Sequence, residues 1–227
     1  MEWMSFDVRP GVTVRAAVVG FAEANCYVLA CDESREAGII DPGTQGKDEA
    51  SAIAAEIERL GASVRYIINT HGHPDHISGN DFLKAAVGGE VLIHELDAFK
   101  LTDPMRNASR MFGFDVRVKP ADRLLEDGET IAVGKVELKV LHTPGHSAGG
   151  IALLGDGYVF TGDTLFAGSI GRSDLPCSSD ENTIAYDVLL DSIRGRLLTL
   201  PEETIVLTGH GPPTTIGEEK RSNPFLR

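Results

Sequence analysis

Three histidines and an aspartate fall within six residues of this 227-residue chain, at His71, His73, Asp75 and His76. They directly follow a short β-type run, and in an extended segment residues i and i+2 point the same way. His71 and His73 can therefore direct two imidazoles at one metal ion. Pro74 then turns the chain, so that Asp75 and His76 reach a second position beside the first. Imidazole and carboxylate ligands suit Zn, Fe or Mn, and two adjacent ions form a hydrolytic arrangement.

Two ions need more ligands than these four, and three later segments offer them. His146, Asp163 and His210 each come shortly after a strand-like run and stand next to or near glycines. Glycine allows tight turns and a close approach of the backbone. Each of the three residues alone could be an ordinary hydrogen-bonded loop residue. Together, four strand ends that each deliver His or Asp predict one metal site along one edge of the sheets.

Hydrophobic patterning predicts strand runs followed by a helix in each half of the chain. This favours two sheets packed face to face with helices outside, in four layers. The expected strands are residues 12–19, 26–30, 37–40, 64–69, 91–93, 130–133, 136–141, 151–154, 158–161 and 204–207, and the expected helices are residues 50–60, 76–87 and 181–198. Residues 101–120 are expected to be irregular. No repeat, charge block or Gly/Ser-rich linker divides the sequence, so we expect one domain, residues 1–227.

The charge balance argues against nucleic-acid and membrane partners. Acidic residues number 34 and basic residues 21, and the resulting net charge of −13 repels phosphate backbones and anionic lipid. No stretch approaches the roughly 18 apolar residues of a membrane span, and the acidic residues near the N-terminus lead us to expect no signal peptide. Cys26 and Cys31 lie on opposite faces of a strand-like run, and Cys177 is expected to be a free thiol. We therefore expect a cytoplasmic protein; its oligomeric state is left open.

The order of these residues resembles that of the metallo-β-lactamase superfamily over essentially the whole chain. The resemblance is closer to glyoxalase II, the hydroxyacylglutathione hydrolases. Besides the candidate ligands, it rests on Ile40-Asp41-Pro42-Gly43, Thr143-Pro144-Gly145-His146-Ser147, Gly162-Asp163-Thr164-Leu165-Phe166-Ala167-Gly168 and Asn223-Pro224-Phe225-Leu226-Arg227. Short bacterial members of that group also share a stretch similar to Ser109-Arg110-Met111-Phe112-Gly113-Phe114.

The resemblance implies an α/β fold, the four-layer αββα sandwich, with two divalent metal ions, Zn by preference and Fe or Mn as alternatives. His71, His73 and His146 would hold metal 1, Asp75, His76 and His210 would hold metal 2, and Asp163 would bridge them. The implied reaction is hydrolysis of S-D-lactoylglutathione, or of a related small-molecule acyl-thioester, by a water that the two ions activate. Asp75 would also act in catalysis, because it could hold or accept the proton of this nucleophile.

The substrate-binding part of the resemblance is less complete. Arg172 resembles a basic residue that contacts the glycyl carboxylate of glutathione, whereas Asp174 replaces an aromatic residue. Only 17 residues follow His210, so we do not expect the helical C-terminal domain that supplies glutathione contacts in the larger enzymes. Phe112 is a candidate for an apolar lid over the acyl group, or else an ordinary loop anchor. Asp41, before Pro42 and Gly43, is a candidate for orienting a ligand histidine from behind, or else a residue that forms the turn.

A second enzyme class fits part of the same pattern. Persulfide dioxygenases of this superfamily resemble the chain in the H-x-H-x-D-H motif and in Gly171-Arg172-Ser173-Asp174. They use a single Fe(II), which here would lie on His71, His146 and Asp163, and the substrate would be glutathione persulfide. Against this interpretation, Thr164-Leu165-Phe166 resembles the hydrolases. A β-lactamase is not expected because such enzymes are exported, and a non-catalytic binding module is not expected because all seven ligand positions are intact.

Overall fold

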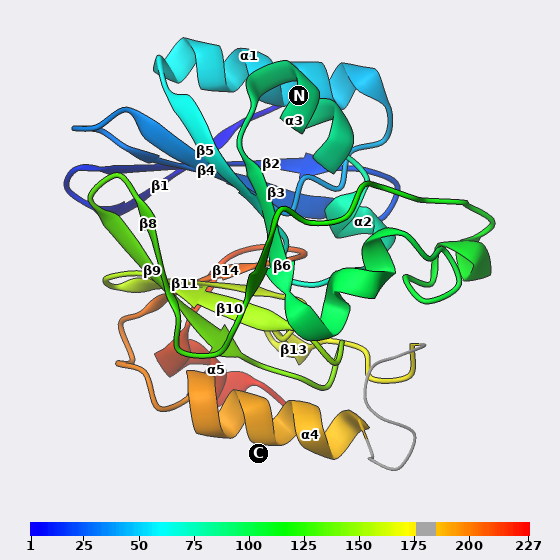
Figure 1. Cartoon of the computed structure of the whole chain (residues 1–227). Coiled ribbons are helices and arrows are strands. Elements are labelled where there is room, and N and C mark those ends of the chain that lie inside the picture. The colour runs from blue at the N-terminus through cyan, green and yellow to red at the C-terminus, as the bar shows by residue number, and fades with distance from the viewer. Residues whose placement is uncertain (176–184) are drawn as a thin grey trace.

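Two β-sheets pack face to face, and helices cover the outer face of each (Figure 1). The computed structural model describes residues 1–175 and 185–227. One sheet has seven strands in the order β1-β2-β3-β4-β5-β6-β7, and the other has six in the order β15-β14-β11-β10-β9-β8. The first sheet is antiparallel from β1 to β4 and parallel from β4 to β7. The predicted α/β sandwich of four layers is confirmed.

The sheets and helices have the following bounds. The first sheet contains β1 (Met4–Arg9), β2 (Val12–Val19), β3 (Ala24–Cys31), β4 (Glu36–Ile40), β5 (Ser63–Ile68), β6 (Glu90–His94) and β7 (Arg123–Leu125). The second contains β8 (Thr130–Val133), β9 (Val136–His142), β10 (Ile151–Leu154), β11 (Tyr158–Gly162), β14 (Ile205–Thr208) and β15 (Thr214–Thr215), and β12 (Leu165–Phe166) pairs with β13 (Ser169–Ile170). The helices are α1 (Lys47–Leu60), α2 (Pro74–Ile77), α3 (Asn80–Val87), α4 (Ala185–Ser192) and α5 (Ile216–Ser222), with 3₁₀ helices η1 (Glu95–Leu101) and η2 (Ser109–Phe112) and the π-helical turn η3 (Ile193–Leu197).

The main hydrophobic core lies between the two sheets. Tyr27 of β3 and Phe160 of β11 meet edge to face in this layer, with ring centroids 5.0 Å apart. Separate apolar clusters lie under α1 and α3 on the first sheet and under α4 and α5 on the second. Cys31 faces the inner core and Cys26 the outer cluster, so these two free thiols lie on opposite faces of β3, as predicted. Cys177 lies outside the described residues.

Every strand that the sequence predicted is present, as β2 to β6, β8 to β11 and β14. The sequence missed β1, β7 and β15, which lie at sheet edges, and the short pair β12 and β13. Edge strands of two to six residues carry little hydrophobic alternation, because neighbours pair with them on one side only. The 101–120 segment is irregular apart from the 3₁₀ turn η2, as expected.

The predicted helix at residues 76–87 is wrong as a single element. The chain forms α2 and α3 instead, with a break at Ser78 and Gly79. The Gly79 N–H donates to the carbonyl of Pro42 at 2.8 Å, and a Cβ at Gly79 would lie only 2.3 Å from that oxygen. The break therefore brings the loop after β4 against the loop that carries the histidine motif.

The predicted helix at residues 181–198 is present from Ala185, as α4 followed by η3. Its first four residues lie outside the described ones. The sequence missed α5, which begins with a Thr215 side chain accepting from the N–H of Glu218. Among the described residues, no helix is long and apolar enough to span a membrane.

Candidate metal centre

All seven candidate metal ligands lie together where the two sheets meet. His71, His73, Asp75 and His76 come from the loop after β5 and from the start of α2, in the first half of the chain. His146, Asp163 and His210 follow β9, β11 and β14 of the second sheet. The strand ends thus bring residues as distant in the sequence as His71 and His210 into one small volume.

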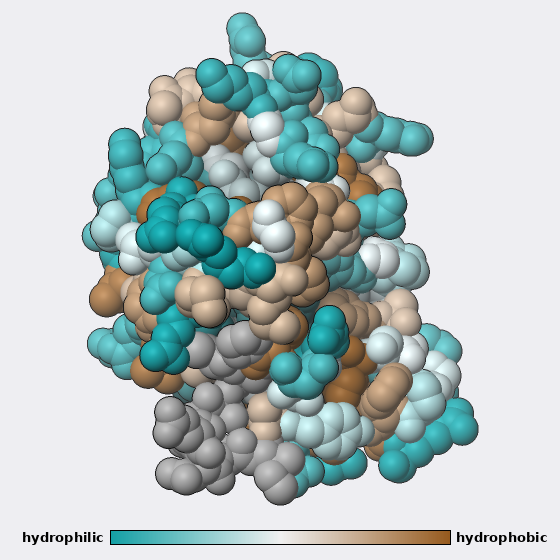
Figure 2. All heavy atoms as spheres, turned by 90° about the vertical axis from the view of Figure 1, so that its right-hand side faces the viewer, coloured by the Kyte–Doolittle hydropathy of each residue, from teal (hydrophilic) through white to brown (hydrophobic). Residues whose placement is uncertain are grey.

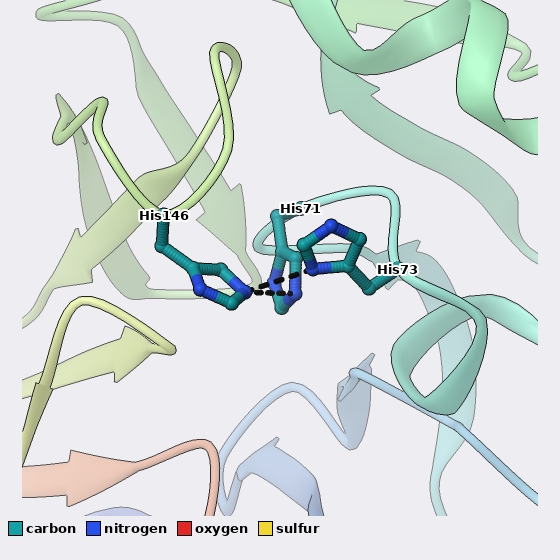
Figure 3. Close-up of side chains that lie close together, drawn as sticks. All are labelled: His71, His73 and His146. Carbon is teal, nitrogen blue, oxygen red and sulfur yellow. Dashed lines mark hydrogen bonds between the residues drawn. The ribbon is translucent and has the colours of Figure 1, made fainter. Parts of the chain in front are cut away.

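Three buried histidines form the first group of potential ligands, His71, His73 and His146 (Figure 3). Nε2 of His146 lies 2.8 Å from Nδ1 of His73 and 3.2 Å from Nε2 of His71. The rings approach one another nearly edge to face, so their nitrogens point to a common centre. Three imidazole nitrogens at one point are a donor set that suits a divalent transition metal.

A second group lies beside the first and contains Asp75, His76 and His210. Nε2 of His210 lies 3.3 Å from both Nε2 of His76 and Oδ2 of Asp75. Asp163 lies between the groups, because its Oδ2 is 3.5 Å from Nε2 of both His146 and His210. The structure therefore brings together the two groups of candidate ligands, with the carboxylate of Asp163 between them.

A buried polar atom supports the fit of these residues to metal ions. Oδ1 of Asp163 is buried and makes no hydrogen bond to any described residue, and it lies 3.4 Å from Nε2 of His76. A buried polar group without a partner costs roughly 1–3 kcal/mol, so an atom left in this way indicates an occupant that satisfies the site. The donor set of imidazoles and carboxylates matches Zn, Fe or Mn.

The pKa values of the first group favour metal binding. Burial lowers the pKa of His71 and His73 well below the ordinary value, and neighbouring histidines and Lys100 lower it further. Burial also lowers the pKa of His146. These imidazoles are therefore neutral at neutral pH, which is the form that binds a metal ion.

The second group is charged instead. Burial alone would lower the pKa of His76, but Asp163, Asp41 and Asp75 raise it to about 9. Burial likewise opposes the charge of His210, yet Asp163 and Asp75 raise its pKa to about 11. Burial would raise the pKa of Asp75 and of Asp163, but the charged histidines lower both to about 2. Two ionised carboxylates in a buried site are a strong attraction for cations.

Asp41 and Thr70 orient two of the histidines from behind. Asp41 accepts hydrogen bonds from the N–H and the hydroxyl of Thr70 at 2.7 and 2.6 Å, and its Oδ2 lies 3.0 Å from Nδ1 of His76. Since the Thr70 hydroxyl donates to Asp41, its oxygen accepts from Nδ1 of His71 at 3.1 Å. Both imidazoles are thereby left with Nε2 free to bind a metal ion.

His146 is oriented in the same way by the main chain. Its Nδ1 donates to the carbonyl of Arg172 at 2.7 Å, so Nε2 faces the other histidines. His210 is held through its loop. The Asn25 amide donates to the carbonyls of Thr208 and Gly211, each at 2.9 Å, and the Tyr27 hydroxyl donates to Thr208 at 2.7 Å. The first sheet thus fixes a ligand loop of the second.

Glycines let the backbone come very close to Asp163. A Cβ at Gly209 would lie 2.2 Å from Oδ1 of Asp163, and a Cβ at Gly171 would lie 1.8 Å from its main-chain oxygen. No side chain fits at either position. The glycines beside the predicted ligands are therefore part of the site, as the sequence suggested.

The sequence missed Asn25, Tyr27, Thr70 and a buried group formed by Asp97, Lys100 and Ser147. The sequence around Asp97 and Lys100 is that of an ordinary charged surface helix, so nothing in it signals that both side chains are fully buried. His94 and His142, which carry no ligand pattern, stack on each other with ring centroids 4.4 Å apart. They belong to neither ligand group.

A cavity of about 330 Å³ opens onto the ligands. Its apolar lining residues are Phe21, Ala22, Pro74, Ala108, Phe112, Phe166, Ile170 and Leu175. Phe21 packs against Phe112 and Phe114 with ring centroids 6.3 and 4.6 Å apart, and all three rings are partly exposed. Figure 2 shows apolar side chains gathered near the middle of this side of the molecule, the side of the 101–120 segment in Figure 1. The predicted residue Phe112 therefore lines the cavity as part of an aromatic wall.

Arg172 also lines this cavity, and its guanidinium is already paired. Its Nε and Nη2 donate to the two carboxylate oxygens of Asp174 at 2.9 and 3.0 Å. Side-chain hydrogen bonding to Asp174 raises the pKa of Arg172 and lowers that of Asp174. A substrate carboxylate at Arg172 would have to share the guanidinium with Asp174 or displace it.

Known proteins are similar to this chain over most of its length. The family model described as Metallo-beta-lactamase superfamily matches residues 19–210. The probable metallo-hydrolase YqgX of Bacillus subtilis is 39% identical over 215 residues, which are 93% of this chain and 96% of that protein. The hydroxyacylglutathione hydrolase GloC of Haemophilus influenzae is 37% identical over 209 residues, 90% of this chain and 93% of that protein.

Several solved structures are also similar to this chain. The B3 metallo-beta-lactamase BLEG-1 matches with a TM-score of 0.84 and 38% identity, over 94% of this chain and 99% of that one. TTHA1623 in a di-iron-bound form has a TM-score of 0.78 and 36% identity, over 93% and 99%. ETHE1 from Myxococcus xanthus has a TM-score of 0.74 and 26% identity, over 93% and 83%. On the fold, the family model and these relatives, the chain belongs to the metallo-beta-lactamase superfamily.

Proposed function

We propose that this protein is a thioesterase that uses two divalent metal ions, Zn by preference, to hydrolyse S-D-lactoylglutathione or a related acyl-thioester. The observation that carries the proposal is the convergence of two ligand groups on either side of Asp163, at the floor of an apolar cavity. Membership of the superfamily and its metallo-hydrolase relatives support a metal-dependent hydrolase. The similarity to GloC supports a thioester as the bond that is cleaved.

The chemistry divides between the ions and the chain. Two divalent ions, when bound, lower the pKa of a water and polarise a carbonyl oxygen. Asp75 is ionised and lines the cavity, so its carboxylate can accept a hydrogen bond from the attacking water and hold its proton. A thiolate with an ordinary pKa near about 8.5 leaves without a strong acid. The low pKa of Asp75 keeps this carboxylate ionised at neutral pH, so it can accept a hydrogen bond from the water but has no proton to donate to the leaving group.

The cavity walls suit the acyl part of the substrate. Phe112 and Phe166 supply apolar surface beside the ligands and exclude water from the reacting bond. The guanidinium of Arg172, which is paired with Asp174, is the contact for the glutathione part of the substrate. Because exposed ion pairs contribute only up to about 1 kcal/mol, a glutathione carboxylate can compete with Asp174 for it.

Steady-state hydrolysis of S-D-lactoylglutathione by the zinc-loaded full chain tests the function. We expect kcat/KM above about 10⁴ M⁻¹s⁻¹, loss of activity with a chelator, and recovery with Zn²⁺. Asp75→Asn should lower kcat by about 10²- to 10⁴-fold. A chromogenic cephalosporin serves as the competing substrate, because the chain is similar to BLEG-1. Faster turnover of the cephalosporin than of every thioester tried would overturn the proposal.

The role of Arg172 needs a pair of substrates with the same acyl group, one on glutathione and one on N-acetylcysteamine, which has no carboxylate. Asp174→Ala releases the guanidinium, so KM for the glutathione ester should fall about two- to fivefold. KM for the N-acetylcysteamine ester should stay unchanged. An equal change for both esters would remove Arg172 from the substrate contacts.

A persulfide dioxygenase is the alternative, favoured by the structural similarity to ETHE1. That activity needs only the positions of His71, His146 and Asp163, on one Fe(II). It leaves the convergence of Asp75, His76 and His210 without a purpose, which is why we prefer the hydrolase. Oxygen uptake with glutathione persulfide by the iron-loaded protein, together with no thioester hydrolysis in the zinc form, would establish the dioxygenase.

A further inference from the structure

A fully buried charged group lies behind the three-histidine group. Asp97 and Lys100 are on the 3₁₀ helix η1, and neither side chain has any exposed surface. Nζ of Lys100 lies 3.2 Å from Oδ1 of Asp97 and also donates to the hydroxyl of Ser147, which in turn donates to Oδ2 of Asp97. Ser147 directly follows the candidate ligand His146.

The carboxylate of Asp97 joins the two loops that carry the three histidines. Its Oδ2 accepts the N–H of Gly72, between His71 and His73, at 2.7 Å. Its Oδ1 accepts the N–H of Gly149, in the loop of His146, at 2.9 Å. One side chain of η1 thus makes hydrogen bonds to backbone on both sides of the group.

The loops also pack directly on η1. A Cβ at Gly72 would lie 2.6 Å from Cβ of Lys100, and a Cβ at Gly149 would lie 2.6 Å from the main-chain nitrogen of Asp97. Each loop therefore rests on η1 at a glycine where no other residue fits. The stem of Lys100 and the backbone of Asp97 set the depth at which each loop sits.

Stability alone does not account for this group. Taking two charges out of water costs several kcal/mol per ion, and well-packed apolar residues in place of a buried ion pair are often equally stable or more so. An apolar pair, however, cannot form directional bonds to Gly72, Gly149 and Ser147. What the charges add is a defined distance between the two loops.

We propose that Asp97, Lys100 and Ser147 are positioning residues that set the placement of His71, His73 and His146, and hence their affinity for a divalent ion. The proposal rests on the metal site proposed above. The group of Asp75, His76 and His210 is oriented by other contacts, from Asp41 and Asn25. Loss of the charged group should therefore weaken the binding of one of the two ions and leave the binding of the other unchanged.

The experiment measures metal binding by the full chain with Zn²⁺ and Co²⁺. Affinities come from competition with a chromogenic chelator, and the visible spectrum of bound Co²⁺ reports the geometry of the histidine group. We expect Asp97→Asn and Lys100→Met to lower the affinity for one of the two ions about 10- to 100-fold and to change the Co²⁺ spectrum. Ser147→Ala should have a smaller effect of the same kind. Lys84→Met, which breaks the exposed pair with Asp122, is the matched control and should change neither reading.

A double variant separates positioning from stability. Asp97→Leu with Lys100→Met replaces both charges by apolar side chains, so the melting temperature of the metal-free protein should recover toward the wild-type value. The affinity that the single variants lower should stay low in the double variant. Recovery of both the melting temperature and the affinity would overturn the proposal, because the charges would then serve stability only.

The two proposals fail in different ways. A wild-type chain that binds no ion tightly contradicts the proposed metal site itself. A wild-type chain that binds two ions, with the same affinities in all three single variants, contradicts only the role of the buried charged group. If Asp97→Asn does not fold, Ser147→Ala and the double variant still give this answer.

Discussion

Oδ2 of Asp41 lies 3.0 Å from Nδ1 of His76, and both side chains are buried. Through the hydroxyl of Thr70 the same carboxylate also acts on His71, so one residue orients a histidine in each ligand group. Asp41 has φ of 52°, in the left-handed region that few residues other than glycine and asparagine or aspartate adopt. The backbone accepts this conformation where the carboxylate makes three contacts at once.

Asp41→Asn should weaken metal binding and lower kcat, each by about 10- to 100-fold. The amide has one acceptor oxygen in place of two, so it cannot serve both Thr70 and His76. Metal titration and steady-state kinetics give the two numbers. Asp122→Asn, at an exposed ion pair, is the control. Equal values for Asp41→Asn and the wild type would show that Thr70 alone orients the histidines.

His73→Ala and His76→Ala remove one ligand from different groups. Each variant should lose about one equivalent of metal and keep the other, because the remaining group retains its own ligands. Elemental analysis of protein loaded with Zn²⁺ and then desalted gives the stoichiometry. Unchanged stoichiometry in both variants is incompatible with two separate ions.

Gly209→Ala should lower both activity and metal content sharply. The added Cβ would lie 2.2 Å from Oδ1 of Asp163 and 2.8 Å from the carbonyl carbon of Gly162, so the carboxylate or the loop must move. Gly195→Ala is the matched control, since a Cβ there meets nothing within 4 Å. Activity assays and metal analysis on both variants check the prediction. A fully active Gly209→Ala protein would place Asp163 outside the reaction.

The stability of the chain should depend on Glu56 in a pH-dependent way. Its pKa is lowered by hydrogen bonds from Arg59 against the opposing effect of burial, with Arg15 adding to the lowering. A carboxyl whose pKa is lowered in the folded state stabilises the fold at pH values above its unfolded-state pKa, near about 4.3. This contribution is lost as the pH falls through the folded-state pKa.

Glu56→Gln should therefore cost about 1–2 kcal/mol at pH 7. The difference from the wild type should shrink as the pH falls below about 4. Chemical unfolding of the metal-free proteins at a series of pH values measures it. A difference that stays constant from pH 7 to pH 3 would contradict an ionised Glu56 as its cause.

The sequence predicts the strands well, and it marks the candidate ligands by their residue types at strand ends, because both depend on local pattern. Apolar runs mark β4 and β5, and the spacing of His71 and His73 is fixed by extended backbone. The break between α2 and α3 was missed because it depends on Gly79 meeting Pro42, a contact between segments far apart in the sequence. The contacts of Asn25 with the loop of His210 were missed for the same reason. Which buried polar groups support a site is decided by packing, and packing leaves no periodic signal.

The division of the ligands between two sheets has a consequence for how such a protein can change. A bound pair of ions ties together two halves that are otherwise joined by packed side chains and a few hydrogen bonds between loops, so the free energy of metal binding opposes any sliding of one sheet over the other. Conversely, the angle and spacing of the sheets determine how the candidate ligands of the two halves meet. A substitution at Phe160, in the middle of the apolar layer and away from the cavity, should therefore change the reaction rate by shifting the candidate ligands of one half against those of the other.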